Sequence, residues 1–185
     1  MPDIIAETAR FVLRTIVEGD AAEQYRVLNT PAVMTHLGGP KELFEIEAKH
    51  AAAMALYARD GFSFLMMIER VSGELVGHCG LKRVDNPLAS NQGDHETGWL
   101  VREDRWRRGY AEEAMRAVLS WAFAQIGAPH VVALTSAANL PSCALMEKLG
   151  MTRRPELDFF DPNYPAHDNP TIQYRLTRTC WEDAS

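Results

Sequence analysis

The sequence predicts an α/β (α+β) fold in a single domain spanning residues 1–185. Two observations support this fold. Strand-like runs alternate with runs whose apolar residues recur at helical spacing, and no repeat or Pro/Ser-rich linker divides the chain. In addition, strand, helix, strand and helix follow one another between residues 97 and 150, which indicates a βαβα unit. A chain of this length buries roughly 70% of its unfolded surface, so its core needs no disulfide or metal.

The first half of the chain combines β-rich runs with two amphipathic segments. Asp60-Gly61 ends the longer of the two helical patterns, and a Ser72-Gly73-Glu74 turn joins two apolar runs. We therefore expect a strand at 11–16, a short helix through Glu23 to Leu28 capped by Asp20, a helix from Glu42 to Arg59, and an antiparallel hairpin of residues 62–70 and 75–83.

The second half of the chain has the clearer signals for where helices begin and end. Gly127 and Pro129 stop a helix, and Asn139 can cap another that closes at Gly150. We expect strands at 97–101 and 130–135, helices at 111–126 and 139–148, and two late strands around 157–160 and 171–177, separated by a Pro-rich loop at 161–170.

Composition excludes several classes of function. The net charge of −6 and the pI near 5.5 argue against general nucleic-acid binding, which needs a basic face. Cys79, Cys143 and Cys180 are far apart and odd in number, so neither a disulfide framework nor a CxxC zinc site is indicated, and we expect no metal. Apolar runs are too short for a membrane span, and the N-terminus lacks a signal-peptide profile. We therefore expect a cytoplasmic protein that binds neither membrane nor nucleic acid.

One polar turn has the composition of an anion site. Trp106 to Ala114 leads from a strand into a helix and contains Gly109. Unsatisfied amides at a helix start attract anions, and a glycine lets a phosphate approach the backbone. Four arginines flank the turn: Arg102, Arg105, Arg107 and Arg108. A pyrophosphate would fit, although a capped helix with solvated arginines explains the same residues.

Several segments together resemble the Gcn5-related N-acetyltransferase (GNAT) superfamily. They are residues 10–14, 73–81, 95–101, 106–114, 139–142, 147–151 and 174–177, which cover nearly the whole chain. Trp106 stands at the first position of the Gln/Arg-x-x-Gly-x-Gly/Ala motif, and in this the sequence is similar to the RimJ/RimL branch. The resemblance implies a mixed, mostly antiparallel sheet of six or seven strands with helices on both faces. It also implies two central strands that splay apart and receive the pantetheine arm of acetyl-CoA.

The resemblance also assigns roles to particular residues. An exposed strand edge would pair with pantetheine, and the turn around Gly109 would hold the pyrophosphate. Asn139 and Ser142, which match the family's second motif, would lie near the thioester. Asn139 and Ser142 can also be explained as a helix cap and a first-turn hydroxyl. The implied cofactor-binding residues are Leu100, Val101, Arg107, Arg108, Gly109, Tyr110, Ala111, Asn139 and Ser142.

Direct acetyl transfer to an amine needs a base, an oxyanion donor and an acid. Glu96 matches the family's base position, where half-burial would raise its pKa; a solvated strand glutamate is the other interpretation. His95 must point to the opposite face of a regular strand. A backbone amide near Leu100 would stabilise the oxyanion. Met146 stands where many relatives have a tyrosine acid, so Ser142 or a water would protonate the thiolate.

The resemblance places the acceptor between two segments, Val33–Phe44 and Phe159–Pro170. The second segment and its neighbour Asp158 bring acidic and aromatic side chains that suit a cationic amine, although an ordinary polar loop has the same composition. We therefore expect an N-acetyltransferase for a protein N-terminal α-amine or a small-molecule amine. The alternative is a non-catalytic acyl-CoA-binding or sensing module of the same fold. A free edge strand would allow a homodimer.

Overall fold

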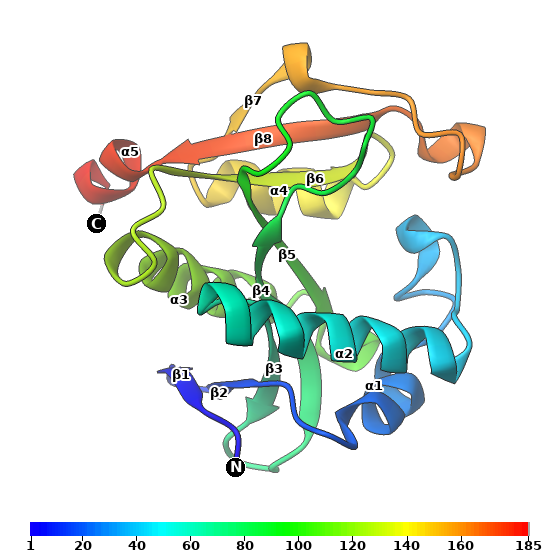
Figure 1. Cartoon of the computed structure of the whole chain (residues 1–185), viewed down its shortest axis with the longest axis vertical. Helices are drawn as coiled ribbons and strands as arrows, with labels where there is room; N and C mark the ends of the chain where they lie inside the picture. The colour runs from blue at the N-terminus through cyan, green and yellow to red at the C-terminus, as the bar shows by residue number, and fades with distance from the viewer. Residues whose placement is uncertain (185) are drawn as a thin grey trace.

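The structure is a computed structural model that describes residues 1–184 (Figure 1). Eight strands form one sheet in the order β1-β2-β3-β4-β5-β6-β8-β7, and every neighbouring pair is antiparallel except β5 and β6. The prediction of a mixed, mostly antiparallel sheet is therefore confirmed. The strands are β1 (Ile4–Glu7), β2 (Phe11–Thr15), β3 (Phe64–Glu69), β4 (Leu75–Arg83), β5 (His95–Val101), β6 (His130–Ser136), β7 (Thr152–Arg153) and β8 (Thr171–Thr177).

The sheet has eight strands rather than six or seven because two short strands extend its edges. β1 pairs with β2 at one edge, and the two-residue β7 pairs with β8 at the other. The prediction of a strand around residues 157–160 is wrong. Pro155–Leu157 forms a 3-10 turn instead, and Phe159 makes one isolated bridge to Thr171.

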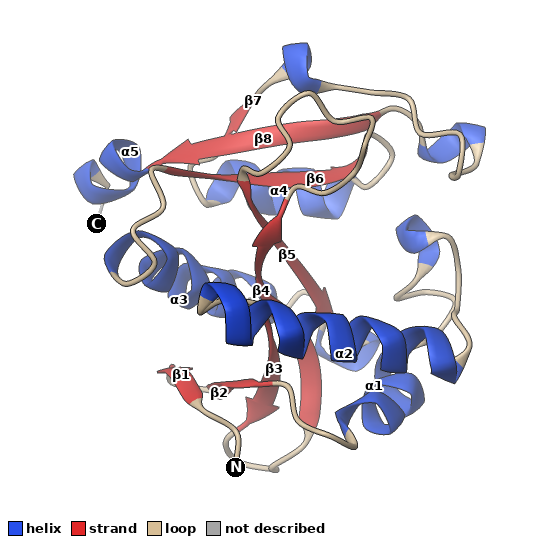
Figure 2. Ribbon diagram, in the orientation of Figure 1, coloured by secondary structure: helices blue, strands red, loops and turns tan. Residues whose placement is uncertain are grey.

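Helices cover both faces of the sheet, as expected (Figure 2). α1 (Asp20–Leu28) and α2 (Leu43–Asp60) pack on one face, where Val27 and Ala53 pack against a small buried cluster that includes Met66 of β3. α3 (Tyr110–Ala124) and α4 (Leu140–Lys148) lie on the other, and α5 (Arg178–Asp183) follows β8. The main core lies between α3 and the sheet, where Met115 and Leu119 pack with Cys79 and other fully buried residues.

Asp20 does not cap α1 from outside, as the sequence suggested. Gly19 holds the N-cap position with a φ of 94°, and Asp20 is the first helical residue. Its carboxylate accepts the Val17 amide at 2.8 Å and pairs with the Arg14 guanidinium at 2.7 Å. An acidic residue in the first turn still favours the helix dipole.

The sheet opens between its two central strands. β5 and β6 are paired only at Glu96–Val132 and Thr97–Ala133, and beyond these pairs the two strands diverge (Figure 2). Gly98–Val101, the second half of β5, pairs with β4 alone. β5 therefore has an open edge inside the sheet. Because α3 connects β5 to β6, the start of α3 lies beside this edge. Across residues 1–184, no helix is both long enough and apolar enough to cross a membrane.

Candidate active site

The turn between β5 and α3 has a backbone suited to an anion. Arg107 has a φ of 58°, and it is the one non-glycine residue with positive φ in the described chain. Gly109 follows with a φ of 73° as the N-cap of α3. Within residues 1–184, the amides of Arg107 to Glu112 donate no hydrogen bond to the protein. These amides and the helix dipole together make a local positive potential.

The four arginines around this turn fall into two groups. Arg102 binds Asp104 and Glu74, and Arg105 binds Asp104 and Glu69. Arg107 and Arg108 are exposed, and neither makes an ion pair with another described residue. Only the second pair is available to a bound phosphate.

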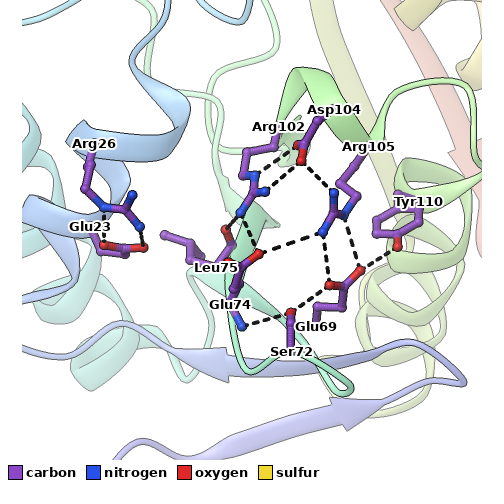
Figure 3. A network of polar contacts seen from close by, with 10 residues as sticks. All are labelled: Glu23, Arg26, Glu69, Ser72, Glu74, Leu75, Arg102, Asp104, Arg105 and Tyr110. Carbon is purple, nitrogen blue, oxygen red and sulfur yellow. Dashed lines mark hydrogen bonds and ion pairs between the residues drawn. The ribbon is translucent and has the colours of Figure 1, made fainter.

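The first pair of arginines belongs to a network that anchors the segment before the turn (Figure 3). Glu69, at the end of β3, accepts the Tyr110 hydroxyl at 2.5 Å, the Ser72 hydroxyl at 2.7 Å and the Arg105 guanidinium. Hydrogen bonds from Tyr110, Ser72 and Arg105 lower the pKa of Glu69 to about 2. The network links the β3–β4 hairpin to the residues on both sides of the turn.

The open edge of β5 presents the backbone of Trp99 and Val101. The Arg102 amide donates to Val76 on β4, and the Leu100 carbonyl also faces β4, beside Gly77. Because backbone groups alternate along a strand, those of Trp99 and Val101 face the opening. The expected pairing of pantetheine with the Leu100 backbone is therefore not available at this edge. Trp106 donates its indole N–H to the Val101 carbonyl at 2.7 Å, so the Val101 amide is the free group of that residue.

Glu96 lies on the sheet face that α1 and α2 cover, and it is 15% exposed at its side chain. Burial raises the pKa of Glu96, as the sequence analysis expected, while the charge of Lys82 opposes the rise. Lys82 lies opposite on β4, with Nζ 3.4 Å from the Glu96 carboxylate and 2.7 Å from Asp85. His95 takes the other face, where its ring lies 5.3 Å from that of Phe62.

The start of α4 follows β6 on the far side of the opening. Asn139 caps the helix, because its carbonyl oxygen accepts the Ser142 amide at 3.3 Å and its amide donates to Thr135 at 3.0 Å. The Ser142 side chain is half-buried, and no described residue hydrogen-bonds its hydroxyl. Met146 is fully buried in the core, and burial raises the pKa of the Cys143 thiol, which disfavours a nucleophilic role.

Comparisons with known proteins agree with this geometry. The model of the Acetyltransferase (GNAT) domain family matches residues 10–152. The chain belongs to the GNAT acetyltransferase family. It is an acetyl-CoA-dependent acyltransferase that acetylates an amine.

Relatives of this GNAT acetyltransferase include the uncharacterized protein YkkB of Bacillus subtilis (strain 168). It is 30% identical over 145 residues, which are 78% of this chain and 83% of that protein. An acetyltransferase structure from Agrobacterium tumefaciens (strain C58) is 30% identical, with a TM-score of 0.73 and 92% of each chain covered. The RimL ribosomal L7/L12 alpha-N-protein acetyltransferase shares the fold at 15% identity, with a TM-score of 0.75 over 96% of this chain and 95% of that one.

The two segments expected to bind the acceptor meet in this GNAT acetyltransferase. His36 Nδ1 lies 2.7 Å from Asp168 Oδ1, and the Asp168 side chain is 1% exposed. Burial raises the pKa of Tyr164, and the charges of Asp161, Asp168 and Glu96 act in the same direction.

The other acidic residues of this region are engaged elsewhere. Asp158 pairs with Arg153, and Asp161 accepts hydrogen bonds from Asn86 and Asn163. Phe160 is exposed. Within residues 1–184, no three His, Cys, Asp or Glu side chains are grouped so that they could hold a metal ion.

Sequence reasoning missed three participants in this site. Lys82 faces Glu96 only because β4 and β5 pair in one particular register. Trp99 reaches the open edge through its backbone, which strand alternation alone could have indicated. Arg10, near the start of the chain, reaches the turn through a hydrogen bond to the Arg108 carbonyl.

Proposed function

We propose that this enzyme holds the pyrophosphate of acetyl-CoA on the turn from Arg107 to Ala111 and acetylates a primary amine by direct transfer in a ternary complex. The observation that carries the proposal is the row of amides from Arg107 to Glu112, which have no acceptor within residues 1–184. The exposed guanidinium groups of Arg107 and Arg108 supply further donors for phosphate.

The residues of the open edge and of α4 supply the rest of the donor site. The pantetheine arm lies between β5 and β6 and pairs with the backbone of Trp99 and Val101. The thioester lies at the end of the arm further from the pyrophosphate, near the Trp99 amide, which is closer to Glu96 along β5, and this amide stabilises the oxyanion. Asn139 and Ser142 stand at the start of α4 on the other side of the arm.

Glu96 is the general base in this proposal. The amine nitrogen attacks the thioester carbonyl carbon, and its proton passes to the Glu96 carboxylate directly or through a water. The C–S bond breaks when the tetrahedral intermediate collapses, and the thiolate takes a proton from the Ser142 hydroxyl or from water. The raised pKa of Glu96 brings its basicity closer to that needed at neutral pH.

The acceptor lies on the Glu96 face of the sheet, between the segment around His36 and the loop that carries Tyr164 and Asp168. The buried Asp168 carboxylate, which contacts His36 through Oδ1 and lies 3.7 Å from His167 through Oδ2, brings negative charge to this region, and such a charge favours a cationic amine. A protein N-terminal α-amine, as the printed name of RimL indicates for that protein, and a small-molecule amine both fit this chemistry.

Calorimetric titration with acetyl-CoA tests the donor site. Gly109→Val places a branched side chain at a φ of 73°, which distorts the turn, and we expect acetyl-CoA binding to be lost. Gly127→Val is the matched control at the far end of α3, with a φ of 75° and an arginine nitrogen 3.7 Å from its Cβ position, against 3.5 Å at Gly109. Equal affinity in the two variants would reject the turn as the pyrophosphate site.

A thiol-release assay tests the chemistry. We expect free thiol to appear from acetyl-CoA faster when a suitable amine is added. Binding of acetyl-CoA without amine-dependent release across a panel of N-terminal peptides, polyamines, amino acids and amino sugars would contradict direct transfer to an amine.

A further inference from the structure

Arg10 lies in the turn between β1 and β2, and its guanidinium reaches the turn that starts α3. Nη1 donates to the Arg108 carbonyl at 2.7 Å, and Nη2 donates to the Gly109 carbonyl at 3.0 Å. These contacts join residues 98 and 99 positions apart in the chain. One planar group thus fixes two consecutive carbonyls of the turn.

These two hydrogen bonds set the direction of two amides. The carbonyl of Arg108 shares a peptide plane with the amide of Gly109, and the carbonyl of Gly109 shares one with the amide of Tyr110. In a trans peptide, the C=O and N–H bonds point in opposite directions. Because both carbonyls point toward Arg10, the amides of Gly109 and Tyr110 point away from it, toward the side where the phosphate is proposed to lie.

Arg10 is itself held rigidly. Its Nε lies 2.6 Å from Glu113 Oε2, and its own amide donates to Glu113 Oε1 at 2.9 Å. The guanidinium also stacks over the Tyr110 ring, 4.3 Å from the ring centroid. The pairing compensates the charge of a carboxylate in the first turn of α3, which would otherwise repel an anion bound there.

We propose that Arg10 is the positioning residue of the donor site: it orients the amides of Gly109 and Tyr110 toward the pyrophosphate without touching the substrate. This inference rests on the proposed function, because it assumes that the pyrophosphate lies on this turn. The planar, two-pronged shape of the guanidinium is what this role requires. A lysine ammonium is a compact point charge and cannot bind both carbonyls in the same geometry.

The test compares two acetyl donors. Acetyl-CoA carries the pyrophosphate, whereas S-acetylpantetheine has the same thioester and arm but no pyrophosphate. For Arg10→Gln we expect the KM for acetyl-CoA to rise about tenfold or more, with kcat within about twofold. The KM for S-acetylpantetheine should stay at the wild-type value. Arg10→Lys should behave like Arg10→Gln, and it also serves as the test variant if the glutamine variant does not fold.

Arg70→Gln is the matched control. Arg70 lies beside Arg10, is 46% exposed at its side chain against 36% for Arg10, and pairs with Glu7 rather than with the turn. This variant should leave the KM for both donors unchanged. Circular dichroism melting of each variant shows whether the fold is intact.

Three outcomes would overturn the proposal. If Arg10→Gln leaves both KM values unchanged, or raises them equally, Arg10 has no specific link to the pyrophosphate. If Arg10→Lys retains the wild-type KM for acetyl-CoA, charge rather than shape is what matters. If the wild-type enzyme has the same KM for both donors, the turn is not the pyrophosphate site, and the proposed donor site fails together with this inference.

Discussion

The proposed donor and acceptor sides of the site differ in how firmly the chain holds them. On the donor side, Arg10 and Glu69 brace the turn from two directions, and Trp106 closes the end of β5. On the acceptor side, the only hydrogen bond between the two segments within residues 1–184 joins His36 to Asp168. The difference indicates a donor site preorganised for one ligand and an acceptor site whose loops can adjust to its amine.

Removing Glu96, the proposed base, should have the largest effect, because it stops the chemical step itself. We expect Glu96→Gln to lower kcat by about 100-fold or more, since an amide cannot accept the amine proton. The affinity for acetyl-CoA, measured by calorimetry, should not change. His95→Ala is the neighbouring control on the opposite face of β5 and should retain most activity. A fully active Glu96→Gln enzyme would rule out this residue as the base.

Removing the hydrogen bond between His36 and Asp168 should affect the binding of the acceptor amine but not the binding of acetyl-CoA. In His36→Ala, the buried Asp168 carboxylate loses its partner, and we expect the KM for the acceptor amine to rise about tenfold. The Kd for acetyl-CoA should stay constant, because no contact of the donor turn is removed. If both constants change together, the two sides of the site are coupled and do not differ in the way proposed.

The pH dependence of kcat/KM tests the environment of Glu96, the proposed base. The Lys82 charge lowers the pKa of Glu96, so Lys82→Met should raise that pKa further. The carboxylate would then ionise only at higher pH, and the acid limb of the kcat/KM profile should move toward alkaline pH. Kinetics across the acid range check this shift. Movement of the acid limb toward lower pH would contradict the assigned proximity of Lys82 and the base.

Removing the charge of Glu69, which holds the residues around the turn, should give the smallest effect. This effect should appear in the thermal stability of the protein. Glu69 has a pKa near 2 in the fold, against an unperturbed value of 4.5, so its charged form stabilises the folded state above about pH 4.5. Glu69→Gln should lower Tm by about 2–4 °C at neutral pH. The difference should shrink as the pH falls from 4.5 toward 2. A difference that persists at pH 2 would show that the ionised carboxylate is not its source.

The sequence predicted the elements that depend on neighbouring residues. The capped helix that starts after Asn139, the hairpin around Gly73 and the helix ending at Gly61 all occur as expected. Each is set by periodicity and by cap or turn residues within a few positions. β1 and β7 were not predicted, because such short edge segments acquire their conformation from the strand they pair with.

By itself, the sequence determined the resemblance to GNAT acetyltransferases, the glycine turn and the placement of Glu96 and His95 on opposite faces, because these are local or alternating features. Only the tertiary structure decided which arginines remain available for phosphate. The pairing of Glu69 with Arg105 and the grip of Arg10 on the turn join residues 36 to 99 positions apart. Such contacts depend on sheet order and strand register, which long-range packing sets and no local pattern records.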